Sequence, residues 1–198
     1  MSADHSAPSK PSTAPDMTRL NVCVYCGSST GDDPKFSAAA EALGARLAAE
    51  NVGLVYGGGK IGLMGVCARR VMADGGRVTG VIPDFLQTIE IAFDGITELH
   101  VTRSMHERKQ LMFEKSDAFV ALPGGIGTLE EVIEMLTWAQ LGRHNYPIIF
   151  LNIEGFWDPL TSLFDHMISN GFMKSNIRGH YAVVDRVEDV LPRIEAVL

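Results

Sequence analysis

The feature that most constrains the fold is an alternation of short, almost wholly apolar runs with longer amphipathic segments. Runs with little polar interruption are typical of strands that are covered on both faces of a sheet. Strand and helix in repeated succession predict an α/β protein whose mostly parallel sheet has helices on both sides. We expect about seven strands, from runs that begin at Leu20, Val52, Arg77, Ile96, Asp117, Pro147 and Tyr181.

The segments between these runs carry the signals of helix starts. A cap residue followed by proline, as in Asp33-Pro34, is typical of a first helical turn. Ser104 has a glutamate three residues later, which is the spacing of a capping box. We expect helices that begin after Asp33, at Ser104, at Thr128 (ending near Leu141), after Asp158-Pro159 and after Asp185.

The two ends of the chain differ in composition. Residues 1–18 are rich in Ser, Pro and Ala and have almost no large apolar side chain, so we expect a disordered tail. This stretch also lacks the apolar centre of a secretion signal. Residues 19–198 show one continuous pattern without a linker or an internal repeat, which predicts a single domain.

Charge and cysteine content exclude several classes of protein. Lys plus Arg is 17 and Asp plus Glu is 24, so the net charge is −7, whereas dedicated nucleic-acid binders usually carry a basic excess. No apolar run reaches the roughly 18 residues that a membrane span needs. The three cysteines are too few for a disulfide scaffold, and their odd number suits a reducing compartment, so we expect a cytoplasmic protein.

Three of the predicted strands end in glycine-rich loops that lead towards helices. These loops read CGSSTG from Cys26, YGGGKIGLMG from Tyr56 and LPGGIGTLEE from Leu122. Ligands of parallel α/β proteins bind beyond the carboxyl ends of the strands, and glycine lets backbone N–H groups approach an anion there. We therefore predict a phosphate cradle for a nucleotide-like ligand, with contributions from Gly27, Ser28, Gly58, Gly59 and Gly124.

The glycine spacing narrows the type of nucleotide site. The second loop has the spacing G-x-x-G-x-x-G, which differs from the dinucleotide fingerprint, and Asp84 after the third strand lies late for a ribose-binding acid. A P-loop is excluded because Ile61 follows Lys60 where Ser or Thr is required, and Leu54 occupies the place of the first glycine.

The loop after the fifth strand supplies the candidate catalytic carboxylates. Gly124, Gly125, Gly127 and Thr128 are predicted at the helix start, with Glu130 and Glu131 in the first turn. A structural interpretation is open, because Thr128 and Glu131 also fit a capping box. The functional interpretation is that a carboxylate, kept ionised by the helix N-terminus, stabilises the oxocarbenium-like ribose formed when a base departs.

The cation that such a site needs is offered by the segment MHERKQLM. Arg108 and Lys109 lie in the first turns of a predicted helix, where basic residues are unfavourable beside the helix dipole. A solvated helix face is the simple alternative for both residues. A guanidinium at Arg108 has the fork-shaped donors that suit phosphate, ribose or base.

The blocks SMHERK, LPGGIGTLEE and TWAQLG resemble the LOG family of cytokinin riboside 5'-monophosphate phosphoribohydrolases. The family pattern P-G-G-x-G-T-x-x-E is matched in full from Pro123 to Glu131, and the resemblance extends over essentially all of residues 20–198. It implies a Rossmann-like three-layer fold, a homodimer and no cofactor. Sequences of this kind have also carried the label lysine decarboxylase, but nothing marks any of the six lysines as an anchor for pyridoxal phosphate.

The resemblance also implies roles for individual residues. The family's catalytic pair corresponds to Arg108 and Glu131 in this chain. A glutamate after the third strand contacts the ligand in the family, and its best match here is Glu90, in a loop of variable length. The remaining substrate-binding positions correspond to Lys109, Gly125, Ile126, Gly127, Thr128, Leu129, Glu130 and Thr137.

Other reactive residues have simple structural interpretations. Cys23 and Cys26 have the spacing of a redox pair, but Cys23 lies within a predicted strand, and alternation turns the two side chains to opposite faces. No second cysteine pair or histidine spacing completes a metal site, so we predict none. Core packing or a dimer contact accounts for Met112, Phe113, Met135, Leu136 and Trp138.

The residues and the resemblance together lead to the hypothesis of a hydrolase. It cleaves the N-glycosidic bond of N6-modified purine riboside 5'-monophosphates or AMP, releasing free base and ribose 5-phosphate. Two alternatives stay open at this stage. One is a non-catalytic module of the same fold that binds a nucleotide or cofactor, in which Glu131 is only a cap. The other, a nicotinamide-dependent oxidoreductase, is disfavoured by the glycine spacing.

Overall fold

The computed structural model describes residues 20–198, and the predicted disordered tail at 1–18 lies outside them. Seven strands form one sheet in the order β4-β3-β2-β1-β5-β6-β7, and every pairing is parallel. The predicted α/β class and strand number are therefore confirmed. The strands are β1 (Asn21–Tyr25), β2 (Gly53–Tyr56), β3 (Val78–Pro83), β4 (Glu98–Thr102), β5 (Ala118–Ala121), β6 (Ile148–Leu151) and β7 (Ala182–Val184).

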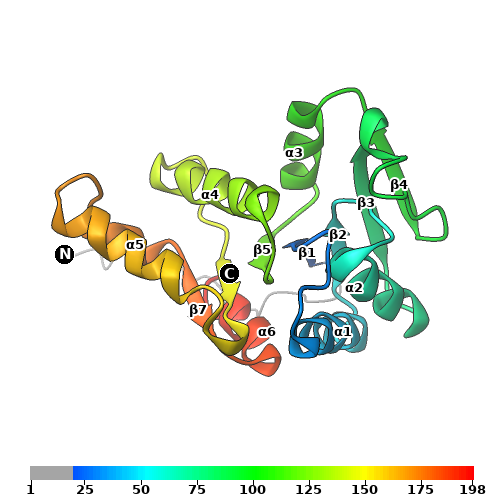
Figure 1. The fold of residues 1–198 in the computed structure, drawn as a ribbon, viewed down its shortest axis with the longest axis horizontal. Helices are drawn as coiled ribbons and strands as arrows, with labels where there is room; N and C mark the ends of the chain where they lie inside the picture. Colours follow the sequence, from blue (N-terminus) through cyan, green and yellow to red (C-terminus); the bar gives the residue numbers. More distant parts are fainter. Residues whose placement is uncertain (1–19) are drawn as a thin grey trace, which may run out of the picture.

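Helices cover both faces of the sheet and give three layers (Figure 1). One face carries α1 (Pro34–Ala49), α2 (Gly62–Ala73) and α6 (Val190–Glu195). The opposite face carries α3 (Met105–Glu114), α4 (Ile126–Gln140) and α5 (Asp158–Ser169). Within residues 20–198, no helix combines the length and the apolar character needed to cross a bilayer.

The apolar core consists of one cluster on each side of the sheet, because strand side chains alternate between the two faces. Cys23 belongs to one cluster and Cys26 to the other, as the alternation predicts. Burial raises the pKa of both thiols, so both stay protonated at neutral pH. The two cysteines therefore form neither a redox pair nor a metal site with each other.

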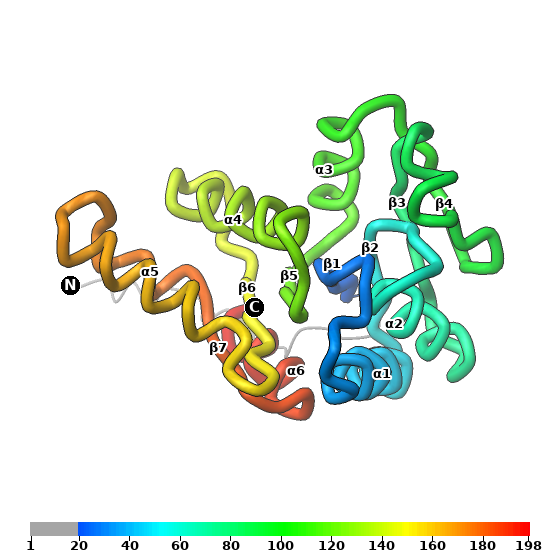
Figure 2. Tube along the Cα trace, in the orientation of Figure 1, coloured from blue at the N-terminus to red at the C-terminus, as the bar shows by residue number. Residues whose placement is uncertain are grey.

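The chain path places a switch in direction at the centre of the sheet. From β1 the chain winds outward through β2, β3 and β4, and then returns to place β5 on the other side of β1 (Figure 2). The pairing of Tyr25 with Ala121 brings the loops after β1 and β5 next to each other. A crevice at such a switch point is where open α/β sheets bind ligands.

The predicted helix starts are confirmed for α1 and α3. The carboxylate of Asp33 accepts a hydrogen bond from Lys35 N at 2.9 Å, and Pro34 opens α1. The hydroxyl of Ser104 accepts from Glu107 N at 3.2 Å. The carboxylate of Glu107 reaches back one residue further than the capping-box pattern requires, to the N–H of Arg103.

The predicted start of α4 is wrong by two residues. The helix begins at Ile126 with Gly125 as its cap residue, and no side chain caps it. Thr128 and Glu131 consequently lie inside the helix, where both side chains are buried, and they do not form a capping box. Backbone freedom at glycine allows the helix to begin without the cap residue on which the sequence pattern depends.

The cap at α1 predicts a measurable stability difference between two adjacent aspartates. Replacing Asp33 by alanine removes the acceptor for Lys35 N and is expected to lower the free energy of unfolding by about 1 kcal/mol. Asp32→Ala is the matched control, with an expected change within about 0.5 kcal/mol. Urea denaturation followed by circular dichroism measures both. Equal losses in the two variants would contradict the capping role.

Candidate active site

Charged side chains gather in a cavity of about 340 Å³ at the carboxyl end of the sheet. Its walls come from the loops after β1 and β3 and from α2, α3 and the first turns of α4. The cavity therefore lies where the switch point of the sheet places a ligand. It is lined by the predicted site residues Ser28, Glu90, Arg108, Gly125, Ile126, Gly127, Thr128, Glu130 and Glu131.

Arg108 projects from α3 into this cavity and is held by two backbone carbonyls. Its side chain is 6% exposed. Nε donates to Val81 O at 3.1 Å, and Nη2 donates to Gly57 O at 3.3 Å. A buried cation is tolerated only when its donors are partnered in this way. The solvated-face alternative is therefore wrong for Arg108, and the guanidinium is fixed in one orientation.

Glu131 faces Arg108 from α4. Thr128, Glu131 and Met135 are buried on one side of the helix, at the spacing that turns side chains towards the sheet. The carboxylate lies 3.7 Å from Arg108 Nη1, close enough for attraction but beyond hydrogen-bond distance. A small group of a ligand in the cavity can therefore contact both side chains.

The pKa of Glu131 is raised to about 7, mainly because the carboxyl is buried. Arg108 opposes this rise, while the charges of Glu130 and Glu90 add to it. The expectation that the helix N-terminus keeps this carboxylate ionised is wrong. Because α4 begins at Ile126, Glu131 lies in its second turn, beyond the reach of the dipole effect, and desolvation dominates.

Glu90 completes the group of side chains around Arg108. One carboxylate oxygen lies 4.0 Å from Arg108 Nη2 and is buried without a hydrogen-bond partner in the described structure. Burial raises the pKa of Glu90, and Arg108 opposes the rise. A buried acceptor without a partner, at the edge of a cavity, is available to a hydroxyl or N–H donor of a ligand.

Gly58 and Gly59 position the Glu90 segment instead of lining the cavity. Phe93 N donates to Gly58 O at 3.0 Å, and Lys60 N donates to Glu90 O at 3.2 Å. Gly59 pairs with Ala92 in an isolated antiparallel bridge. These bonds use the carbonyl of Gly58 and the N–H of Lys60, and neither glycine lines the charged cavity, so the phosphate contacts predicted for Gly58 and Gly59 stay predictions.

The loops after β1, β2 and β5 are joined through Gly27. Its N–H donates to Pro123 O at 3.1 Å, and its carbonyl accepts from Leu63 N at 3.0 Å. This second bond uses an N–H of the first turn of α2. Neither helix has a side-chain cap, but at α4 no loop carbonyl of the described residues accepts from the N–H groups before Leu129, so these groups remain available to an anion. Of the starts of α2 and α4, the start of α4 therefore has the free N–H groups beside the charged cavity.

A second hollow of about 310 Å³ adjoins the first and shares Ser28 and Gly125 with it. Gly27 and Gly124, two predicted cradle residues, line this second hollow. A side chain at Gly124 would overlap Thr128 Oγ1, so glycine is needed there for the loop to close over α4. Together the two hollows leave room beyond the charged group for the larger part of a ligand.

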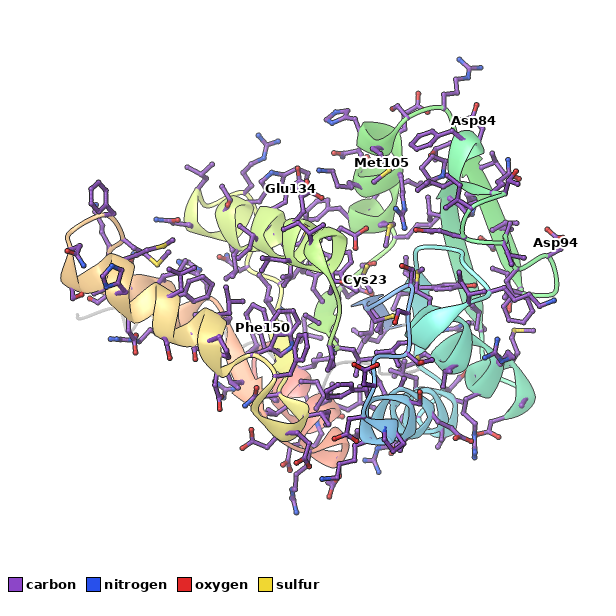
Figure 3. The ribbon with its side chains drawn as sticks, viewed as in Figure 1. Cys23, Asp84, Asp94, Met105, Glu134 and Phe150 are labelled. Carbon is purple, nitrogen blue, oxygen red and sulfur yellow. The ribbon has the colours of Figure 1, made fainter. Side chains whose placement is uncertain are left out.

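Lys109 lies outside the cavity lining. Its ammonium group pairs with Glu130 and with Glu134, the latter at 3.1 Å. This arrangement joins α3 to α4, and Figure 3 shows Glu134 on the side of α4 towards α3, which carries Met105. Lys109 thereby compensates the charge of Glu130 beside the cavity. A direct contact with a ligand requires this ion pair to rearrange.

Thr137 and Leu129 lie away from the charged cavity, although the resemblance places both at the substrate. Both line an apolar groove of about 220 Å³ that α4 forms with α5. The hydroxyl of Thr137 donates to Ile133 O at 2.8 Å within α4. Asp84 is exposed where β3 ends, its carboxylate accepts from Phe85 N, and it is not among the residues that line the charged cavity (Figure 3).

Three further residues line the cavity without having been predicted as site residues. Cys26 directly follows β1, Met64 lies in the first turn of α2 and Met105 opens α3. Two signals in the sequence could have found them: Cys26 and Met64 belong to the glycine-rich loops, and the helical spacing of Met105 and Arg108 places these two on one face. Soft, apolar side chains next to the charged group suit the flat face of a purine.

Solved structures resemble this fold. The molybdenum cofactor carrier protein of Chlamydomonas reinhardtii superposes with a TM-score of 0.68, covering 90% of this chain and 96% of that chain at 20% identity. The molybdenum cofactor binding protein of Rippkaea orientalis superposes equally well, at 22% identity and with the same coverage. At these identities the likeness concerns the fold alone, which is Rossmann-like.

Sequence relatives are much closer. The profile of the family described as "Possible lysine decarboxylase" matches residues 64–194. A probable cytokinin riboside 5'-monophosphate phosphoribohydrolase of Oryza sativa subsp. japonica is 43% identical, covering 97% of this chain and 86% of the relative. The cytokinin riboside 5'-monophosphate phosphoribohydrolase of Arabidopsis thaliana is 45% identical, covering 89% of this chain and 86% of the relative. The enzyme of that name from Rhodococcoides fascians is 43% identical, covering 90% of this chain and 91% of the relative. This chain belongs to the LOG family of cytokinin riboside 5'-monophosphate phosphoribohydrolases.

Proposed function

We propose that this protein hydrolyses the N-glycosidic bond of purine riboside 5'-monophosphates, including AMP and its N6-modified forms. The observation that carries the proposal is the buried pair of Arg108 and Glu131 beside the uncapped start of α4. An anion site and a carboxylate thus lie on consecutive turns of one helix. The names of the relatives support the same reaction.

The proposed reaction assigns one task to each part of the site. The first-turn N–H groups of α4 bind the phosphate, with Gly125 and Gly127 leaving open space around them. As the bond between base nitrogen and C1' breaks, the electron pair leaves with the base, and Glu131 in its ionised form stabilises the positive ribose. Water adds to C1' and loses a proton, while the base takes one up. The products are free base and ribose 5-phosphate.

Arg108 and Glu90 orient the substrate in this proposal. The guanidinium presents Nη1 towards Glu131, and the unpartnered oxygen of Glu90 accepts from a ligand hydroxyl. The guanidinium has several N–H donors in one plane, and the protein already holds them in place. Little reorganisation of these donors is therefore needed when charge develops in the transition state. Arg108 is therefore assigned to positioning the substrate and to assisting departure of the base.

The family description "Possible lysine decarboxylase" does not lead to a second proposal. A lysine that anchors pyridoxal phosphate reacts as a neutral amine. Lys109, the lysine beside the cavity, pairs with both Glu130 and Glu134, which favour its protonated form. The residues around the cavity therefore do not fit that cofactor.

The protein is further proposed to act as a homodimer through the apolar groove between α4 and α5. The groove is lined by Leu129, Ile133, Leu160 and Leu163, and Leu163 is 45% exposed. A second copy is the favoured occupant because Thr137, which the resemblance assigns to the substrate, lies in this groove and not in the charged cavity. Because α4 lines both the groove and the charged cavity, two copies that pack here would place the partner chain near the active site.

A cytoplasmic location belongs to the same proposal. Cys23, Cys26 and Cys67 are all free and buried, as is usual for thiols in a reducing compartment. Cell fractionation with an antibody against the protein tests this location.

The proposed reaction is tested by incubating the protein with AMP and with isopentenyladenosine monophosphate. We expect free base and ribose 5-phosphate in equal amounts, measured by chromatography. Glu131→Gln is expected to lower kcat by about 1000-fold or more, because a neutral amide cannot stabilise the cationic ribose. Its affinity for ribose 5-phosphate, measured by calorimetry, is the control and should persist. Binding of nucleotide without any turnover by the wild type would instead support the non-catalytic module.

The raised pKa of Glu131 predicts the pH dependence of the reaction. Below about pH 7 the carboxyl is protonated and cannot stabilise positive charge, so kcat/KM should rise as pH increases through this value. Since the substrate's phosphate also titrates near pH ~6, the diagnostic result is a difference between variants. Glu90→Gln removes a charge that raises the pKa of Glu131, so the rise should move to lower pH. An unmoved profile would contradict this electrostatic coupling.

The proposed dimer predicts a change in mass upon a single substitution. Leu163→Glu places a charge in the apolar groove and is expected to convert the dimer to a monomer in analytical ultracentrifugation. Leu198→Glu is the control, because Leu198 is similarly exposed at 47% but lies outside the groove. A wild-type protein that sediments as a monomer at micromolar concentration would refute this part of the proposal.

A further inference from the structure

Gly57, the residue that follows β2, lies directly against the guanidinium of Arg108. Its carbonyl accepts from Arg108 Nη2 at 3.3 Å. A Cβ atom built on Gly57 would overlap Nη2, closer than any real side chain approaches, and would lie 3.0 Å from Met64 Sδ. The thioether of Met64 is flexible and can move aside, whereas the guanidinium is fixed by its hydrogen bonds. Arg108 is therefore the neighbour that requires glycine here.

The backbone conformation at Gly57 does not itself require glycine. Gly58, the next residue, has a φ of +80°, which favours glycine whatever surrounds it. Gly57 has no positive φ. The two neighbours thus need glycine for different reasons, and the reason at Gly57 is the space that Arg108 occupies.

The carbonyls of Gly57 and Val81 form a two-point support for a planar group. Val81 O binds Nε, and Gly57 O binds Nη2, so the plane of the guanidinium is set by two neighbouring strands. In this arrangement Nη1 donates to Met105 Sδ at 3.8 Å and lies 3.7 Å from the Glu131 carboxylate. Displacing Nη2 turns the plane and redirects Nη1, because the guanidinium is rigid.

We propose that Gly57 is a positioning residue for Arg108: its carbonyl and the absence of its side chain fix the guanidinium in the orientation that faces Glu131. Gly57 touches no ligand in this proposal and acts only through Arg108. Since the task of Arg108 rests on the proposed function, the test needs one readout that is independent of catalysis. The coupling of two substitutions in thermal stability supplies it.

The experiment is a double-mutant cycle with Gly57→Ala, Arg108→Ala and the two together. In the wild-type background, Gly57→Ala is expected to lower kcat/KM for AMP by about 100-fold, the usual consequence of a misplaced catalytic group, and to lower Tm. In the Arg108→Ala background, the same substitution should change neither kcat/KM nor Tm further, since the group that it displaces is absent. Equal losses in both backgrounds would overturn the proposal.

The remaining variants separate the possible failures. Gly76→Ala is the control for crowding remote from the site, because its Cβ would meet Val71 and Ala48. We expect it to lower Tm in both backgrounds and to leave kcat/KM at the value of each background. If Gly57→Ala alone does not fold, the double variant must still fold as well as Arg108→Ala, or the proposal is wrong. A wild type without hydrolase activity refutes the proposed function, while the Tm cycle still decides whether Gly57 and Arg108 are coupled.

Discussion

The buried guanidinium of Arg108 is the interaction on which the arrangement of the site depends. A charge with so little exposure must be partnered, and its partners come from four separate segments: the end of β2, β3, the loop that carries Glu90, and α4. These segments are far apart in the sequence, so the cation brings them into one constellation. The two carbonyls supply hydrogen bonds, and the two carboxylates, at longer distances, face the space in which a ligand can bind.

The glycine-rich loops serve the site in three different ways. The loop after β1 joins its neighbours through the two backbone bonds of Gly27. The loop after β2 makes room for Arg108 at Gly57 and fastens the Glu90 segment at Gly58 and Gly59. Only the loop after β5 leads to a helix start whose N–H groups remain available. Loops of similar composition therefore have different structural tasks.

Much of the fold was predictable, because the apolar runs and the cap at Asp33 act over a few residues. The proximity of Arg108 and Glu131 came from the family resemblance, since helices α3 and α4 meet only in the tertiary structure. The start of α4 was mispredicted because Gly125 begins the helix without the side-chain cap that the pattern at Thr128 suggested. The pKa of Glu131 was mispredicted because a local pattern carries no information about burial. The position of Thr137 was also not predictable, because it lines a groove between α4 and α5 that forms only in the tertiary structure.

The raised pKa of Glu131 resolves a conflict within the proposed reaction. A fully ionised carboxylate near a bound phosphate would repel it in the ground state, yet the departing base requires negative charge beside C1'. With a pKa of about 7, the carboxyl of Glu131 is partly protonated near neutral pH, and this lessens the repulsion of the phosphate while the substrate binds. As positive charge develops on the ribose, the ionised form is favoured, and the proton that the carboxyl loses is available to the departing base. Burial thus makes the interaction stronger in the transition state than in the ground state, which is the condition for acceleration.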